Sequence, residues 1–278
     1  AQFWQEQPPY GRMYYRGVPK RSKGGPRPFV VEPDISLWAK ILDFTVYDFF
    51  HDPEVYLNRQ IQMNLHKSEV FKDNTYFSGE ITPYPGVVFE LSLFGIECIY
   101  PRNKNPWINP EPILQDYEDL EKLEKPDFYT SGLMPRVHEF YQRFQEMVGD
   151  TLMVVFPDWL FSPFGIAVHL RGLTNLLVDL LVNPEWVHKL LSFITESHKD
   201  WIKERATFLN QEIGKAKLFN DEVDCPVISP ENYRDLILPH ELELEKFHSG
   251  ILYFHSCGNL SKLLPEIRKL KSLEMLHL

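Results

Sequence analysis

Three places in the sequence bring reactive side chains to the end of a predicted strand, and the clearest is His255-Ser256-Cys257. The apolar run 251–254 directly precedes it. Residues i and i+2 of an extended segment point to the same side, so His255 and Cys257 can reach one ion. Imidazole and thiolate are ligands that Zn²⁺ prefers, and Gly258 lets the backbone turn away sharply. The alternative is a satisfied core histidine beside a small buried thiol.

The second place follows Phe219, where the sequence reads Asn220-Asp221-Glu222-Val223-Asp224-Cys225. Acidic groups at the carboxyl end of a strand can serve in general acid–base catalysis, orient a substrate or act as a further metal ligand. We therefore predict Asp221 and Glu222 as catalytic residues. The alternative is a solvated loop, and Cys225 is interpreted as a packed thiol.

The third place runs from Pro157-Asp158-Trp159 through Ser162-Pro163-Phe164-Gly165 to His169. A strand end with an acid, aromatic rings and a glycine makes a pocket wall that carries one charged group. Asp158, Phe164 and His169 are the predicted substrate-binding residues. His169 falls on a helical stretch, where a core histidine is the alternative.

Alternating strand and helix patterns must position these residues, and short links between them predict a parallel sheet with crossover helices. An open doubly wound sheet usually carries a Gly-rich phosphate turn after its first strand, and the sequence has none. A closed (β/α)8 barrel of the TIM type is therefore the expected α/β fold. The predicted strands are 151–156, 217–219, 251–254 and 273–278, and the predicted helices are 165–182, 183–214, 229–248 and 260–270.

The pattern divides the chain into an extended N-terminal arm, residues 1–33, and a barrel domain, residues 34–278. The arm is rich in Pro, Gly, Arg and aromatic residues, which do not sustain a helix. From Asp34 a helical period places Trp38, Ile41, Leu42 and Thr45 on one face, and Pro53 opens a helix that reaches about Phe71. Because the chain stops at or just after a strand, we expect the barrel to be incomplete at its C-terminus.

Composition narrows the class of protein. The 278 residues carry a formal charge of −10, which disfavours the phosphate backbone of nucleic acid as a partner. No run approaches the roughly 18 apolar residues that cross a bilayer, so no membrane partner is expected. Three cysteines are too few for a disulfide scaffold and indicate a cytoplasmic protein.

From about Ile81 onward the chain resembles the uroporphyrinogen decarboxylase superfamily. The resemblance lies in Ser162-Pro163-Phe164-Gly165 with Leu170-Arg171-Gly172, in the stretch 181–191, in 228–240, and in His255-Ser256-Cys257-Gly258-Asn259. It covers about two-thirds of the chain in the family's order and spacing. The family fold is a β/α barrel, in agreement with the pattern above.

Within the superfamily, the resemblance favours zinc methyltransferases over true decarboxylases. Decarboxylases carry an Arg-rich N-terminal segment that Arg12-Met13-Tyr14-Tyr15-Arg16 does not follow, and their Phe-Ser-Asp-Ile-Leu stretch is closest to Phe77-Ser78-Gly79-Glu80-Ile81, which lacks the Asp. The Tyr that decarboxylases carry after the Pro-Phe segment corresponds to His169 in this chain. The methyltransferases carry His-x-Cys, matched by His255 and Cys257, and a later Cys that would lie beyond Leu278; Glu222 or Asp221 are alternative ligands.

The resemblance thus implies methyl transfer between a small substrate and a corrinoid carried by a partner protein. Zinc would either draw charge from the heteroatom of a methyl donor, such as an aryl methyl ether or a methylamine, or activate a thiol acceptor. The direction of transfer stays open, as does whether the arm covers the site or receives the corrinoid protein. The alternatives are a metal-free decarboxylase and a non-catalytic barrel.

Overall fold

The computed structural model describes residues 29–75, 79–225 and 227–277. The first 28 residues of the predicted arm lie outside this part of the chain, as do Phe77 and Ser78. The fold divides into two compact units. The first comprises the described residues up to Val88 together with 98–107 and 135–157, and the second comprises 89–97, 108–134 and the described residues from Asp158 onward.

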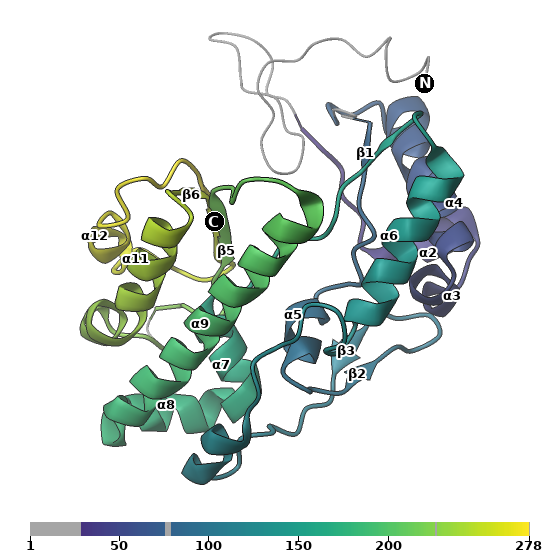
Figure 1. Ribbon diagram of the computed structural model, residues 1–278. Helices are drawn as coiled ribbons and strands as arrows, with labels where there is room; N and C mark the ends of the chain where they lie inside the picture. The colour runs from purple at the N-terminus through teal and green to yellow at the C-terminus, as the bar shows by residue number, and fades with distance from the viewer. Residues whose placement is uncertain (1–28, 76–78, 226, 278) are drawn as a thin grey trace, which may run out of the picture. The chain divides into compact units, whose positions relative to one another are not determined.

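Helices dominate the first unit (Figure 1). Its core combines aliphatic side chains with many aromatic ones, among them Trp38, Phe49, Tyr56 and Phe144. Asp34 caps the first helix through its side chain, which accepts a hydrogen bond from the Leu37 N–H. The elements are α2 (Ile35–Leu42), α3 (Val46–His51), α4 (Pro53–His66), the π-helical turn η1 (Lys67–Phe71), α6 (Met134–Val148), and the parallel pair β1 (Glu80–Ile81) and β4 (Met153–Val154).

Three expectations for this unit are wrong in detail. The strand predicted over 151–156 is only Met153–Val154, and Met153 is 57% exposed rather than buried on both faces. Ile41 is 38% exposed, although it shares the apolar period of the helix. Thr45 does not continue the first helix but caps α3, because its hydroxyl accepts from the Asp48 N–H.

Parallel strands form the centre of the second unit. They lie in the order β5 (Ala216–Phe219), β6 (Ile251–His255) and β7 (Leu276–His277), and Phe161 adds an isolated parallel bridge to Phe219. Helix α11 (Leu238–Phe247) lies between β5 and β6 in the chain, the long helix α9 (Pro184–Leu209) precedes β5, and the two helices pack on each other (Figure 1). Parallel strands with crossover helices are the β/α architecture that the sequence predicts.

Among the described residues, the strand hydrogen bonds form parallel β/α units but do not form the closed barrel that the sequence predicts. Besides the three-stranded sheet, the described residues form the pair β1–β4 and a small sheet of β2 (Cys98–Ile99) and β3 (Trp107–Ile108). The remaining elements are α5 (Phe89–Leu93), the 3-10 helix η2 (Tyr117–Lys122), α7 (Pro163–Arg171), α8 (Leu173–Val182), α10 (Pro230–Asn232), η3 (Tyr233–Ile237) and α12 (Leu264–Ile267).

The helix boundaries of the second unit follow capping chemistry. Asn183 caps α9 as predicted, with Pro184 in its first turn, but the helix ends at Asn210 in the left-handed conformation rather than at Gly214. The single helix predicted over 165–182 is two helices, because Gly172 adopts φ +82° and turns the chain by 107°. The helix predicted over 260–270 is helical only from Leu264 to Ile267.

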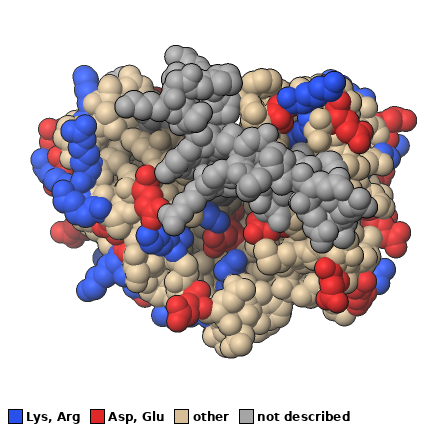
Figure 2. Space-filling model, turned by 90° about the horizontal axis from the view of Figure 1, so that it is seen from above, with Lys and Arg blue, Asp and Glu red and all other residues tan. Residues whose placement is uncertain are grey.

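No single described helix has the length and apolar content to cross a membrane, although α7 and α8 together meet that test by length and composition. The cytoplasmic location stays a prediction. Figure 2 shows basic and acidic side chains of described residues interspersed on one face.

Candidate metal centre

The carboxyl ends of β5 and β6 lie side by side. Phe219 pairs with His255 in the parallel register, and the Asn220 N–H donates to the His255 carbonyl at 2.8 Å. The loop that follows β5 and the segment that follows β6 therefore leave the sheet at the same edge. This is the edge where the sequence predicted that reactive residues would gather.

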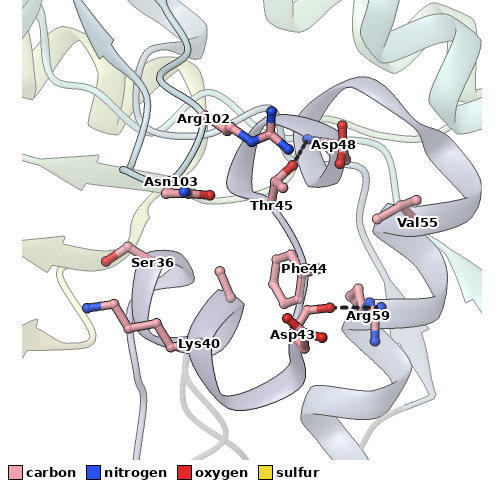
Figure 3. A pocket seen from close by; sticks show the side chains of 11 residues that line it. Ser36, Lys40, Asp43, Phe44, Thr45, Asp48, Val55, Arg59, Arg102 and Asn103 are labelled. Atoms are coloured by element: carbon pink, nitrogen blue, oxygen red, sulfur yellow. Dashed lines mark hydrogen bonds between the residues drawn. The ribbon is translucent and has the colours of Figure 1, made fainter.

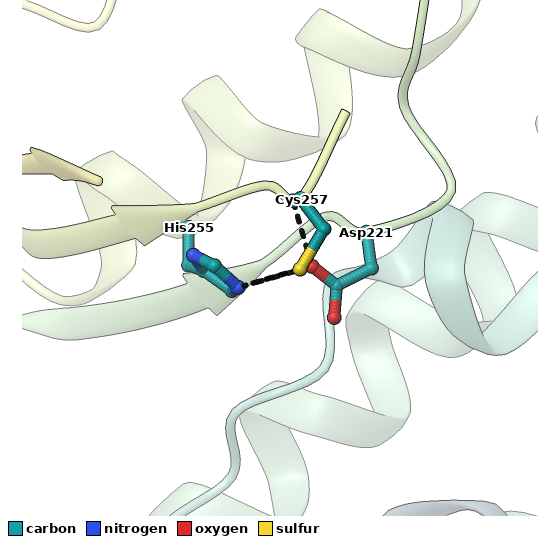
Figure 4. Close-up of side chains that lie close together, drawn as sticks. All are labelled: Asp221, His255 and Cys257. Carbon is teal, nitrogen blue, oxygen red and sulfur yellow. Dashed lines mark hydrogen bonds and ion pairs between the residues drawn. The ribbon is translucent and has the colours of Figure 1, made fainter. Parts of the chain in front are cut away.

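His255 and Cys257 converge there (Figure 4). The Nε2 atom of His255 lies 3.3 Å from the Sγ atom of Cys257. The imidazole is buried at 7% exposure, whereas the Cys257 side chain is exposed. The two side chains thus point to one place, as their i, i+2 spacing requires, and that place is reachable from solvent.

Asp221 supplies a third converging group. Its Oδ1 atom lies 3.2 Å from His255 Nε2 and accepts a hydrogen bond from the Cys257 N–H at 3.1 Å. One potential ligand atom from each of the three residues lies within 4.8 Å of the others. The sequence named Asp221 as a catalytic residue or an alternative ligand, and the structure brings it to His255 and Cys257.

Gly258 is required by close packing rather than by a special backbone angle. The backbone bends at Cys257 and Gly258 as the sequence predicts, although the φ of Gly258 is not in the left-handed region. A Cβ atom at this position would lie 2.7 Å from Asp224 Cβ and 2.9 Å from Asp224 Oδ1. Asp224 in turn accepts the Asn259 N–H at 2.5 Å, so this carboxylate holds the segment that follows Cys257.

The Glu222 side chain contacts His169 rather than the cluster of His255, Cys257 and Asp221. Its Oε1 lies 3.1 Å from His169 Nε2 on α7, with both side chains about 15% exposed. The second oxygen, Oε2, is buried without a hydrogen-bond partner among the described residues. A Cβ at Gly165 would lie 2.8 Å from this oxygen, so the carboxylate packs directly on the first turn of α7. The structure therefore pairs two predicted site residues, Glu222 and His169.

Two further predicted residues do not join these groups. Asp158 pairs with Lys217 at 3.1 Å and accepts the Trp159 N–H. Phe164 has no exposed surface and packs in the core. Their substrate-binding roles stay predictions. Cys225 is 8% exposed, as expected of a packed thiol.

Sequence reasoning missed His277, which touches the predicted ligand His255 from the neighbouring strand. The Nδ1 atoms of the two rings are 2.7 Å apart. Only the parallel register of β6 and β7, which pairs His255 with His277, shows this contact. The sequence gives no local signal for it, because the two residues belong to separate strands.

A buried acid was also missed. Glu241 on α11 has no exposed surface and accepts hydrogen bonds from the Tyr233 hydroxyl and, at 2.7 Å, from Asn220 Nδ2. Burial raises the pKa of the Glu241 carboxyl to about 7, although both hydrogen bonds favour the charged form. Asn220 links this acid to the strand end, since its N–H bonds the His255 carbonyl.

A cavity of about 630 Å³ lies in the first unit, lined by α2, α3 and neighbouring segments (Figure 3). Lys40, Arg59 and Arg102 contribute cations, and Asp43 and Asp48 contribute acids. None of the predicted site residues lines this cavity.

Comparison with known proteins decides the family. Residues 80–278 match the family described as uroporphyrinogen decarboxylase (URO-D). The chain belongs to this family. All the residues that converge at the ends of β5 and β6 lie inside the matched region.

Two proteins similar to this chain are methyltransferases. The methylated-thiol–coenzyme M methyltransferase of Methanosarcina mazei is 30% identical over 160 residues, which are 55% of this chain and 41% of the relative. The chain thus matches less than half of that relative's length. A solved methyltransferase from Methanosarcina mazei superposes with a TM-score of 0.62 at 16% identity, covering 90% of this chain and 69% of the other, and it supports the fold.

The donor set fits zinc. An imidazole nitrogen, a thiol sulfur and a carboxylate oxygen are all ordinary Zn²⁺ ligands, and a site with three protein ligands leaves a position for substrate. The exposed side of this cluster is formed by Cys257 and Asp221. The cluster therefore has both the chemistry and the access that a catalytic zinc site needs.

Proposed function

We propose that this chain is a methyltransferase that moves a methyl group between the sulfur of a small thiol compound and a corrinoid held by a partner protein. Two findings support the proposal. His255, Cys257 and Asp221 converge at the carboxyl edge of a parallel sheet, and the similar protein from Methanosarcina mazei is named for transfer from methylated thiols to coenzyme M. The convergence of these three groups carries the proposal.

In this proposal His255 Nε2, Cys257 Sγ and the Asp221 carboxylate would hold zinc. Zinc held there would supply Lewis-acid chemistry that favours the thiolate form of a sulfur at neutral pH, whether that sulfur is the leaving group of a methylated thiol or the nucleophile of a free thiol. Demethylation breaks the C–S bond with its electron pair staying on sulfur, and the methyl group passes to the nucleophilic corrinoid. Methylation of a thiol is the reverse of this step.

The pair Glu222–His169 handles the proton in the same proposal. Histidine transfers protons readily near neutral pH, and the Glu222 carboxylate orients the ring through the 3.1 Å contact at Nε2. A thiol that becomes a nucleophile must lose a proton, and a thiolate that leaves must gain one. His169 accepts the proton in the first case and returns it in the second.

The test uses full-length protein, free cob(I)alamin as the acceptor and dimethyl sulfide as the donor. Formation of methylcobalamin is followed by its visible spectrum, and the reverse reaction is run with methylcobalamin and coenzyme M. Cys257→Ser and His255→Ala should bind zinc more weakly than the wild type and should lose activity. Cys98→Ser, at a half-buried cysteine in the first unit, is the matched control and should retain both zinc affinity and activity.

Two outcomes would contradict the proposal. One is full methyl transfer by zinc-free protein or by Cys257→Ser. The other is decarboxylation of a porphyrinogen substrate without zinc, which would assign this chain the alternative activity of the superfamily.

A further inference from the structure

His277 is held in a fixed relation to His255 by the sheet. The two residues are register partners in the parallel pair β6–β7, and the Ser256 N–H donates to the His277 carbonyl at 3.2 Å. Side chains of register partners lie on the same face of a sheet. The two imidazole rings are 4.7 Å apart between centroids, and their planes are tilted by 31°.

The contact between the rings joins like atoms. Nδ1 of His255 and Nδ1 of His277 are 2.7 Å apart, which is a hydrogen-bond distance. Of two facing imidazole nitrogens, one must carry the hydrogen and donate it while the other accepts with its lone pair. The contact therefore links the tautomer of His255 to that of His277.

The opposite nitrogen of His255 faces the cluster. Nε2 lies 3.3 Å from Cys257 Sγ and 3.2 Å from Asp221 Oδ1. An imidazole binds a metal through a nitrogen that carries no hydrogen, so binding at Nε2 requires the hydrogen on Nδ1. His277 Nδ1 is placed to accept that hydrogen.

We propose that His277 is a positioning residue which accepts the Nδ1–H of His255 and so keeps Nε2 available for zinc; this rests on the proposed function. The hydrogen bond sets both the tautomer and the ring angle of His255. His277 is not itself a ligand at this cluster through Nδ1, because that atom faces the side of His255 opposite to Nε2.

A packing role is the competing explanation. The His277 ring also stacks on Tyr253, with centroids 5.8 Å apart and planes within 26°. Loss of the ring would then disturb His255 by leaving space rather than by removing an acceptor. The two roles can be separated by variants of His277 that retain, displace or remove the hydrogen-bond acceptor facing His255.

The experiment compares three substitutions in the full-length protein. His277→Asn places an amide oxygen near the position of Nδ1 and retains an acceptor. His277→Gln carries its amide farther out, near the position of Nε2, and His277→Phe keeps a flat ring without an acceptor. Zinc affinity is measured by chelator competition, and Co²⁺ binding is followed by its absorption spectrum.

We expect Phe and Gln to weaken zinc binding by about 10- to 100-fold, as loss of a partner behind a metal-bound histidine does elsewhere. Asn should stay within about threefold of the wild type. His188→Asn is the matched control, since His188 forms a separate imidazole contact with His240 at 3.4 Å, and it should leave zinc affinity unchanged.

Two results would overturn the inference. One is wild-type zinc affinity in both the Phe and the Gln variants. The other is equal loss in the Asn, Gln and Phe variants, which would assign His277 to packing alone. If wild-type protein binds no zinc that depends on Cys257, the proposed function fails instead, and the two failures are thereby distinguished.

Discussion

The substitution Gly258→Ala tests how tightly the segment after Cys257 is packed. The added Cβ would lie 2.7 Å from Asp224 Cβ, whereas carbon atoms in contact normally stay about 3.5–4.0 Å apart. One segment must therefore move by about 1 Å. Because the backbone φ of Gly258 is one that alanine also adopts, this collision is the cause of the expected effect.

A shift of this size matters at the neighbouring residue, Cys257. Zn–S bonds are about 2.3 Å long and tolerate about 0.2 Å of error, so the displaced thiolate binds poorly. We expect zinc affinity to fall at least about tenfold, or ~1.4 kcal/mol, and the zinc-free protein to lose about 1–3 kcal/mol of stability from overpacking. Chelator competition and thermal unfolding measure these two effects.

The double variant Gly258→Ala with Asp224→Gly removes the colliding atoms and should recover most of the zinc affinity. Asp224→Gly alone is the control, because it gives up the hydrogen bond to the Asn259 N–H, worth ~1 kcal/mol. Wild-type zinc affinity in Gly258→Ala would refute this reasoning. Failure of the double variant to recover any affinity would show that the collision with Asp224 is not the cause.

Two further predictions concern the acidic side chains of Glu222 and Glu241. The methyl group added by Gly165→Ala should displace the Glu222 carboxylate from His169 and lower kcat about 10²- to 10⁴-fold. The unfolding temperature should change little, because the higher helix propensity of alanine offsets part of the lost hydrogen bond. An unchanged kcat would show that the Glu222–His169 pair takes no part in catalysis. Glu241→Gln addresses the carboxyl whose pKa is raised to about 7 by burial. A raised folded-state pKa means that stability is present below the unfolded value, near 4.5, and is lost as pH rises through 7. Relative to wild type, Glu241→Gln should therefore gain about 3 kcal/mol between pH 4.5 and 8 in denaturant unfolding; a pH-independent difference would contradict a buried titrating Glu241.

Local rules predicted much of the second unit and the two central side chains of the cluster. The i, i+2 spacing of His255 and Cys257 after an apolar run is enough to place both on one side of an extended segment. Capping chemistry at Asn183-Pro184 likewise fixes where α9 begins. These features depend on neighbours in the sequence, and the structure confirms them.

Features that depend on distant partners were not predictable in the same way. His277 reaches His255 only through the register of β6 and β7, and Asp224 reaches Gly258 only because two loops leave the sheet together. The break between α7 and α8 depends on the positive φ of Gly172, which the continuous apolar helical period of the sequence does not indicate. The exposure of Met153 depends on what covers its strand, which an apolar run does not reveal.

X-ray absorption at the zinc edge most directly tests whether His255 and Cys257 share one metal ion. Full-length wild-type protein, Cys257→Ser and His255→Ala, each loaded at saturating zinc, are compared for sulfur scattering at about 2.3 Å and nitrogen or oxygen scattering at about 2.0–2.1 Å. We predict that Cys257→Ser loses one sulfur from the zinc shell, and that His255→Ala loses one imidazole. Identical zinc environments in the wild type and both variants would contradict the metal centre proposed at the ends of β5 and β6.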